Sequence, residues 1–395
     1  MKHSIFLFTI LFSALFPAGS AFAAEPQVGT GETNGYKLVW QDLFDSGELN
    51  RARWNVEQNG DGGGNNELQY YLDDPATVRV GDDGEGNGCL ILTAIRQSYG
   101  NKQFISGRVN SKNKIAFTHG KIEAAIKLPS TADGLWPAFW MMGNDYDQVG
   151  WPKSGEIDIC EFGHQAGIKN GTQDRFFNGA CHWGQGWPAA SYARDTTEPY
   201  SYQDGEFHLF TLIWDDGVVE MYCDLDRDPS KQPYYRMTIP QDDPDNEWSP
   251  GNYFHKLNFI LFNLAVGGNF PGIHNAAGIT ALNDGNNHQA SMYVNYVKIY
   301  QKGGAGEETS FADPGDDTNA IEGIVTGEGA VTALGYKDGV LTLASAGTIE
   351  VYDLAGRRVA AVNGDMLDVS GVAAGTYVVR AVAEGCAPAT MKIAR

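Results

Sequence analysis

The sequence predicts an all-β protein. Short segments in which apolar and polar residues alternate recur along most of the chain, and such alternation is the mark of strands with one buried face. Turn-forming pairs separate them, among them Asp83-Gly84, Asp133-Gly134 and Asp216-Gly217. Long helical patterns are missing. Together these observations favour a β-sandwich.

The segments can be followed in order. A first strand is expected at Tyr36–Phe44, and residues 58–66, rich in Gly and Asn, are expected to form a loop. The further expected strands are Cys89–Arg96, Phe104–Asn110, Gly120–Leu128, Trp136–Met142, Glu156–Phe162, Phe177–Trp183, Phe207–Trp214, Val218–Asp224, Lys256–Val266 and Ser291–Gln301.

Residues 1–24 are expected to be a signal peptide. Lys2 and His3 give a weakly basic start, and the apolar run of residues 5–15 is too short to span a membrane. Ala21-Phe-Ala23 provides a cleavage signal. We therefore expect a secreted or cell-surface protein, with no membrane span elsewhere.

The alternating pattern stops near Gln301. Residues 303–320 are small, acidic and turn-rich, which predicts a linker. Residues 321–395 contain further short strands, such as Thr348–Tyr352 and Thr376–Ala381, and are expected to form a small β-sandwich-like domain. This leaves residues 25–302 as the main domain.

Composition excludes some partners. The formal net charge is −21, which argues against nucleic acid and anionic membranes, because both require a basic surface. Aromatic residues make up 12% of the chain, and exposed tryptophans could contact the apolar faces of sugar rings. We expect a monomer. The five cysteines are an odd number without zinc-site spacing, so buried free thiols are expected.

One stretch carries the chemistry. Residues 151–163 place Glu156, Asp158 and Glu161 among apolar residues. Alternation puts Glu156 and Asp158 on one face of a strand. A β-bulge near Ile159-Cys160 would bring Glu161 to the same face. The alternative is an edge strand whose acids simply face water.

Three neighbouring carboxylates suit glycoside hydrolysis. Retaining glycosidases use one carboxyl group as nucleophile and a second as acid/base. Like charges push pKa values apart, so that one group can stay protonated and donate to a leaving group.

Gly155-Glu-Ile-Asp-Ile-Cys-Glu161 resembles the signature of family sixteen glycoside hydrolases, and the preceding Trp151-Pro-Lys-Ser is similar to the laminarinase (endo-β-1,3-glucanase) branch. The resemblance covers about residues 35–302. Its other motifs are Asn65–Tyr71, Gly134–Gly143, Asn263–Gly268 and Met292–Gln301. It implies a two-sheet jelly roll of the concanavalin A type, with a cleft across the concave sheet.

The resemblance also implies residue roles. Glu156 would be the nucleophile, Glu161 the general acid/base, and Asp158 a hydrogen-bonding partner between them. The implied enzyme is a secreted retaining endo-β-1,3(4)-glucanase acting on laminarin or mixed-linkage β-glucan. This chemistry requires no metal or organic cofactor.

The resemblance further implies the substrate-binding residues. They are Asn66, Arg108, Glu123, Trp136, Trp140, Trp151, His182 and Asn263. One departure from the family pattern is Glu123-Ala-Ala125, where relatives carry Glu-Ala-Arg. The missing arginine puts one glycan contact in doubt. A structural calcium is possible, although Asn295 stands where an acidic ligand would be expected.

Residues 349–377 resemble the C-terminal sorting domain of the type nine secretion system; a structural or glycan-binding module is the alternative. Two other functions stay open for the main domain. One is hydrolysis of a galactan such as agarose or carrageenan. The other is non-catalytic, lectin-like glycan binding.

Overall fold

The computed structural model describes residues 32–311, 334–337, 340–353, 358–373, 376–383 and 389–394. The chain divides into two compact units, residues 1–312 and 313–395. The predicted signal peptide, Cys386 and half of the predicted linker (residues 312–320) lie outside the described residues. Within those residues, no helix is both long and apolar enough to cross a bilayer.

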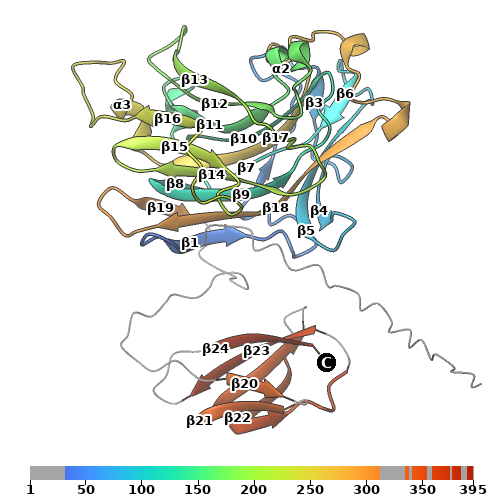
Figure 1. The fold of residues 1–395 in the computed structure, drawn as a ribbon, viewed down its shortest axis with the longest axis vertical. Helices are drawn as coiled ribbons and strands as arrows, with labels where there is room; N and C mark the ends of the chain where they lie inside the picture. The colour runs from blue at the N-terminus through green and yellow to red at the C-terminus, as the bar shows by residue number, and fades with distance from the viewer. Residues whose placement is uncertain are drawn as a thin grey trace, which may run out of the picture. The chain divides into compact units, whose positions relative to one another are not determined.

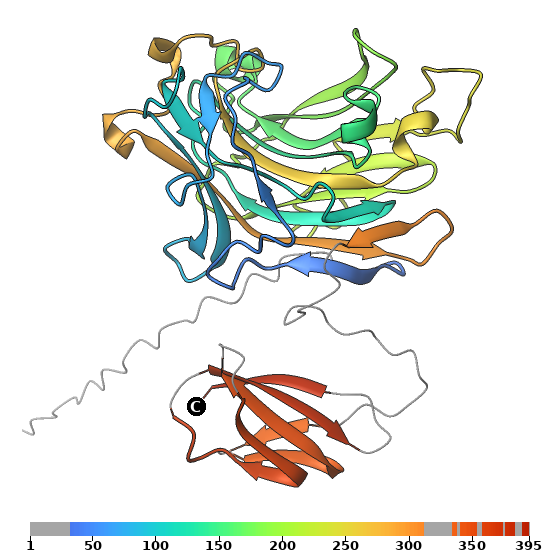
Figure 2. The same ribbon diagram turned by 180° about the vertical axis from the view of Figure 1, so that it is seen from behind.

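The larger unit consists of two stacked sheets (Figures 1 and 2). In spatial order the ten-stranded sheet contains β16 (Tyr235–Thr238), β15 (Val218–Cys223), β14 (His208–Trp214), β9 (Gly120–Lys127), β18 (Gln289–Gln301), β5 (Gly88–Ile95), β6 (Phe104–Ser106) and β3 (Gln69–Tyr71), with β1 (Lys37–Asp42) beside β18 and β4 (Val78–Asp82) beside β5.

The nine-stranded sheet carries the acidic strand near its centre. Its order is β13 (Ala190–Thr197), β12 (Phe176–Trp183), β11 (Glu156–Phe162), β10 (Leu135–Gly143), β17 (Asn258–Val266), β7 (Arg108–Asn110) and β2 (Asn55–Val56), with β8 (Ile115–Thr118) beside β17 and β19 (Glu308–Phe311) beside β8. The helices are short: α1 (Tyr146–Val149), α2 (Gln165–Asn170), α3 (Gly251–Phe254), η1 (Ala276–Gly278) and η2 (Asp284–Asn286).

The apolar core lies between the sheets and fixes the direction of every strand's side chains. Ile122 and Ala124 of β9 meet Phe139, Met141 and Ile157 of the other sheet in one buried cluster. Because side chains alternate along a strand, the residues between these point away from the core. On β10 and β11 they point to the outer face of the nine-stranded sheet, where the candidate site lies.

Two strand predictions need correction. Phe104–Asn110 is not one strand, because β6 belongs to the ten-stranded sheet and β7 to the nine-stranded sheet. Gly107 lies at the crossing, where an added Cβ would come within 2.4 Å of the Thr77 carbonyl oxygen. Part of the predicted linker, Glu308–Phe311, is strand β19, which pairs with β8.

The smaller unit is also built of strands. These are β20 (Leu334–Lys337), β21 (Val340–Asp353), β22 (Arg358–Asp368), β23 (Thr376–Ala383) and β24 (Ala389–Ala394). Leu341, Ile349, Val351 and Val379 are fully buried in its core. The long strand β21 pairs with three others, so one strand organises the unit.

Four cysteines of the larger unit, Cys89, Cys160, Cys181 and Cys223, are free and buried, as predicted.

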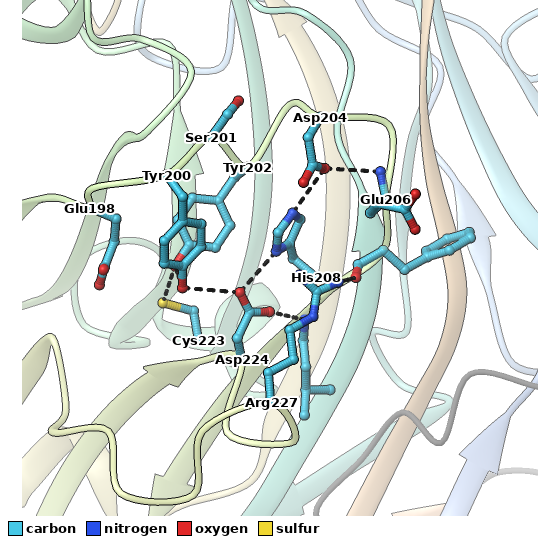
Figure 3. Close-up of polar contacts among 12 residues, drawn as sticks. Glu198, Tyr200, Ser201, Tyr202, Asp204, Glu206, His208, Cys223, Asp224 and Arg227 are labelled. Atoms are coloured by element: carbon cyan, nitrogen blue, oxygen red, sulfur yellow. Dashed lines mark hydrogen bonds and ion pairs between the residues drawn. The ribbon is translucent and has the colours of Figure 1, made fainter.

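A polar cluster around His208 ties the connection before β14 to the end of β15 (Figure 3). His208 is fully buried, with Nδ1 2.9 Å from Asp224 Oδ2 and Nε2 3.1 Å from Asp204 Oδ1. Tyr200 donates its hydroxyl to Asp224 at 3.2 Å, and the Tyr202 ring lies against the imidazole. We call these five residues the His208 cluster.

Candidate active site

The three acids of β11 lie on one face, and a β-bulge places the third. Glu156 is opposite Met142 of β10, and Glu161 is opposite Ala138. Between them the register shifts, because Phe139 is opposite Cys160 whereas the next residue, Trp140, is opposite Asp158. Ile159 is the extra residue, as the sequence predicted.

Each acid has a neighbour that orients it. Glu156 forms hydrogen bonds with Asp158 and with Trp151. Glu161 accepts a hydrogen bond from Trp136 Nε1 at 2.9 Å. His182 Nε2 lies 3.4 Å from Asp158 Oδ2, and His182 is opposite Glu156 on β12.

The acids hold protons unusually well. Burial, together with the charge of Asp158, raises the pKa of Glu156 to about 8. Burial also raises the pKa of Asp158 to about 8, although its hydrogen bond with Glu156 opposes the shift. Burial and the Asp158 charge raise the pKa of Glu161 well above its usual range. At neutral pH these shifts keep protons on the group, so that it can supply a proton donor.

Tryptophans and a partly buried arginine extend the site beyond the acids. The Trp136 ring stacks on Phe270, with centroids 4.6 Å apart. Trp140 Nε1 donates to Asn263 Oδ1 at 2.7 Å, and the Arg108 guanidinium lies 4.8 Å from the Trp140 ring centre. These contacts fix side chains that would otherwise rotate, so the surface beside the acids is preformed.

A cavity of about 320 Å³ lies toward the β7 edge of the same sheet. Its lining residues are Glu57, Gln58, Asn59, Arg108, Asn110, Lys112, Met142, Tyr146, Phe259 and Leu261. Arg108 Nε and Glu57 Oε1 are 2.9 Å apart, in an ion pair. An apolar floor with polar groups at one side is suited to a sugar ring, whose faces are apolar and whose edges carry hydroxyls.

Comparisons with known proteins identify the family. Glucan endo-1,3-beta-glucosidase of Cryptopygus antarcticus is 34% identical over 245 residues, which are 60% of this chain and 82% of that protein. The solved structure of a GH16 protein of the Bacteroides ovatus mixed linkage glucan PUL, in complex with product, is 40% identical, with a TM-score of 0.57, and the match covers 66% of this chain and all of that one. The chain belongs to glycoside hydrolase family 16.

Two further matches cover a smaller share of the other protein or of this chain. Glucan endo-1,3-beta-glucosidase A1 of Niallia circulans is 30% identical over 292 residues, which are 68% of this chain but only 38% of that protein. The family described as "Beta-glucan synthesis-associated protein SKN1/KRE6/Sbg1" matches residues 32–156. These similarities and the two stacked sheets confirm the predicted jelly-roll fold.

Most predicted binding residues of this family 16 chain lie near the acids. Arg108, Trp136, Trp140, Trp151, His182 and Asn263 are linked to them by the contacts above. Asn66 is more distant and exposed. It adopts a φ of 57° and donates to Asn269 Oδ1 at 3.1 Å, beside Phe270.

Glu123 does not belong to this site. It lies on β9 of the ten-stranded sheet, between the core residues Ile122 and Ala124, so its side chain points away from the other sheet. It is fully buried and pairs with Lys121 at 3.1 Å. Ala125 lies on the same far face. The missing arginine at position 125 therefore says nothing about contacts in the cleft.

Sequence reasoning missed several polar residues at the site. Glu57 and Asn110 line the cavity, and Asn178 of β12 is opposite Glu161 and donates to Asp195 Oδ1 at 3.0 Å. The alternation Arg108-x-Asn110 could have indicated Asn110, because both residues must share a face.

The surroundings of Asn295 do not fit a calcium ion. Its amide nitrogen donates to the Gly88 carbonyl oxygen at 2.8 Å, so the neutral side chain is held by a hydrogen bond and supplies no carboxylate for calcium. In the described chain, one group of three or more His, Cys, Asp or Glu residues can bring one ligand atom each within 4.8 Å of all the others, and it is Glu156, Asp158 and His182, within the acid site itself.

Proposed function

We propose that this chain is a secreted endo-β-1,3(4)-glucanase that hydrolyses laminarin or mixed-linkage β-glucan with retention of configuration. The observation that carries the proposal is the shared face of Glu156, Asp158 and Glu161, in which a different indole binds each glutamate. The two relatives described by name as endo-1,3-beta-glucosidases support the β-1,3 linkage, and the Bacteroides ovatus structure supports mixed-linkage glucan.

The proposed reaction is a double displacement. Glu161 gives its proton to the glycosidic oxygen while a carboxylate oxygen of Glu156 attacks the anomeric carbon, so the carbon–oxygen bond to the leaving sugar breaks. Glu161, now ionised, takes a proton from water. The water oxygen attacks the same carbon and releases Glu156. Two inversions give net retention.

Neighbouring groups would set these protonation states. The raised pKa of Glu161 keeps its proton available at neutral pH. The hydrogen bond from Trp151 favours the ionised form of Glu156, whereas the Asp158 charge opposes it. Asp158 is therefore proposed to hold the shared proton while Glu156 attacks.

Export is part of the proposal and rests on residues 1–24. The second unit is proposed to be a sorting domain without a catalytic role, on the resemblance of residues 349–377.

The test is release of reducing sugar from laminarin, barley mixed-linkage glucan, curdlan, agarose and carrageenan, with Glu161→Gln as the matched inactive control. We expect short oligosaccharides from laminarin and barley glucan, and proton NMR should show the β-anomer as the first product. Cleavage of a galactan alone would select the other enzymatic alternative. Binding without cleavage would select lectin-like function.

A further inference from the structure

Trp187 is the most exposed large apolar side chain in the described residues. It is 82% exposed, whereas the fold buries Trp54 and Trp214 completely. Because the Trp187 ring stays in water, it does not contribute the free energy of apolar burial that Trp54 and Trp214 contribute to folding. Its exposure therefore calls for a role outside the packing of this unit.

Trp187 extends an aromatic surface that starts at the acids. Trp151, 38% exposed, hydrogen-bonds to Glu156 and has its ring centre 6.0 Å from that of Trp187, with 33° between the planes. Trp151 lies in the connection from β10 to β11, and Trp187 lies between β12 and β13. Two connections that are separate in sequence thus place their indoles side by side.

The loop that carries Trp187 is anchored by the residues just before it. Gln185 Nε2 donates to the Tyr253 hydroxyl at 2.9 Å, and Trp183 Nε1 donates to the Trp248 carbonyl oxygen at 2.9 Å. Gly184, at a φ of 132°, leaves room for the Trp248 ring, which a Cβ would meet at 2.7 Å. An anchored loop presents its aromatic ring with little entropy left to lose on binding.

The chemistry of such a surface selects a sugar ring. A β-linked glucosyl unit carries its hydroxyls around the ring edge, so that both faces present C–H groups that pack on an indole. A galactosyl unit has one axial hydroxyl that obstructs one face. The continuity with Trp151 and Glu156 places the bound ring on the same glucan chain that is cleaved.

We propose that Trp187, together with Trp151, forms a sugar-binding platform that holds a glucosyl ring of the β-glucan outside the bond that is cleaved. The Trp151–Trp187 platform thereby makes the protein favour long chains over short ones. This inference rests on the proposed glucanase function.

The experiment compares Trp187→Ala and Trp187→Phe with the full wild-type chain, on barley mixed-linkage glucan and on a short aryl β-glucoside of two sugar units. Trp187→Ala should raise KM for the polysaccharide about 5- to 10-fold. It should leave kcat, turnover of the short substrate and Tm unchanged. Trp187→Phe, which keeps an aromatic face, should recover most of the affinity.

An unchanged KM of Trp187→Ala for the polysaccharide would overturn the inference, as would an equal loss on both substrates. A wild-type chain that cuts no glucan would refute the proposed function instead. In that case tryptophan-fluorescence titration with laminarin still decides the platform: a signal lost in Trp187→Ala supports it, and no binding by the wild type refutes it.

Discussion

Two groups of acids occur in the larger unit in different surroundings: Asp158, Glu161 and Asp224 are buried, Glu156 is half-buried and Asp204 is exposed. On β11, Glu156 and Asp158 face each other, and the indoles that bind Glu156 and Glu161 carry no charge. In the His208 cluster, Asp204 and Asp224 lie on either side of one imidazole (Figure 3). In the first group the carboxyl groups adjoin one another and His182 lies to one side, 3.4 Å from Asp158, whereas in the second group the imidazole lies between the two carboxylates.

The pKa values follow this difference. In the cleft, burial and the Asp158 charge raise the pKa of Glu156 and Glu161. Burial alone would also raise the pKa of Asp224, but the hydrogen bond and charge of His208 outweigh it and lower that pKa. His208 thus outweighs the effect of burial on Asp224, whereas His182 and Arg108 oppose but do not outweigh the effect of burial on Glu156.

The largest expected effect is on catalysis. Glu156→Ala should lower kcat by about 10⁴-fold or more, because no carboxylate remains to form the covalent intermediate. Added azide should restore turnover and give product of inverted configuration, read by NMR of the released anomer. Circular dichroism should match the wild type, since Glu156 lies outside the apolar core. A retained product in azide would mean that the two glutamate roles are exchanged.

The next effect is on stability. His208→Ala should reduce the free energy of unfolding by about 3–5 kcal/mol, because the buried carboxylate of Asp224 would lose its imidazole partner. Urea denaturation measures the loss. The folded protein should keep the wild-type kcat, which would show that the His208 cluster contributes to stability and not to catalysis in the cleft. His208→Gln, which retains a hydrogen-bond donor, is the matched control and should lose less. A loss under about 1 kcal/mol in His208→Ala would contradict the compensating role.

A smaller effect tests the coupling among the cleft acids. Asp158→Asn should lower kcat about 100-fold, since Glu156 loses its ionisable partner. The Asp158 charge raises the pKa of Glu161, so its removal should lower that pKa. The alkaline limb of the kcat/KM profile, which reports the protonated acid, should therefore move to lower pH. An alkaline limb that stays in place would show that burial alone sets the pKa of Glu161.

The bulged acid strand could be predicted from sequence because it is local. The alternation of Glu156, Ile157 and Asp158 fixes one face, and only one inserted residue can return Glu161 to it. The pairing of Glu57 with Arg108 could not be predicted in this way. The two residues are far apart in the chain and meet only because Glu57, just after β2, lies beside β7.

Glu123 shows the other limit of sequence reasoning. Alternation correctly separates it from Ile122 and Ala124, but it does not say which of the two sheets the strand joins. In a sandwich both outer faces carry polar residues, and only one of them holds the cleft. This ambiguity does not arise for Trp136, because its strand, β10, pairs directly with the acid strand β11.

The smallest expected effect is a gain in stability with a defined pH dependence. The pKa of Glu161 is raised in the folded protein above its unfolded value of about 4.3. Between these two values the unfolded chain has lost a proton that the native state keeps, so the free energy of unfolding falls as pH rises through that window. Glu161→Gln cannot ionise and escapes this loss. It should be about 1–2 kcal/mol more stable than the wild type at pH 8, with the difference vanishing below pH ~4.

Asp224→Asn is the matched change in the His208 cluster. It should be less stable than the wild type at pH 8, because a carboxyl group whose pKa is lowered in the folded protein contributes stability above its unfolded pKa. If both variants changed stability in the same direction, the contrast between the two acid groups would be lost.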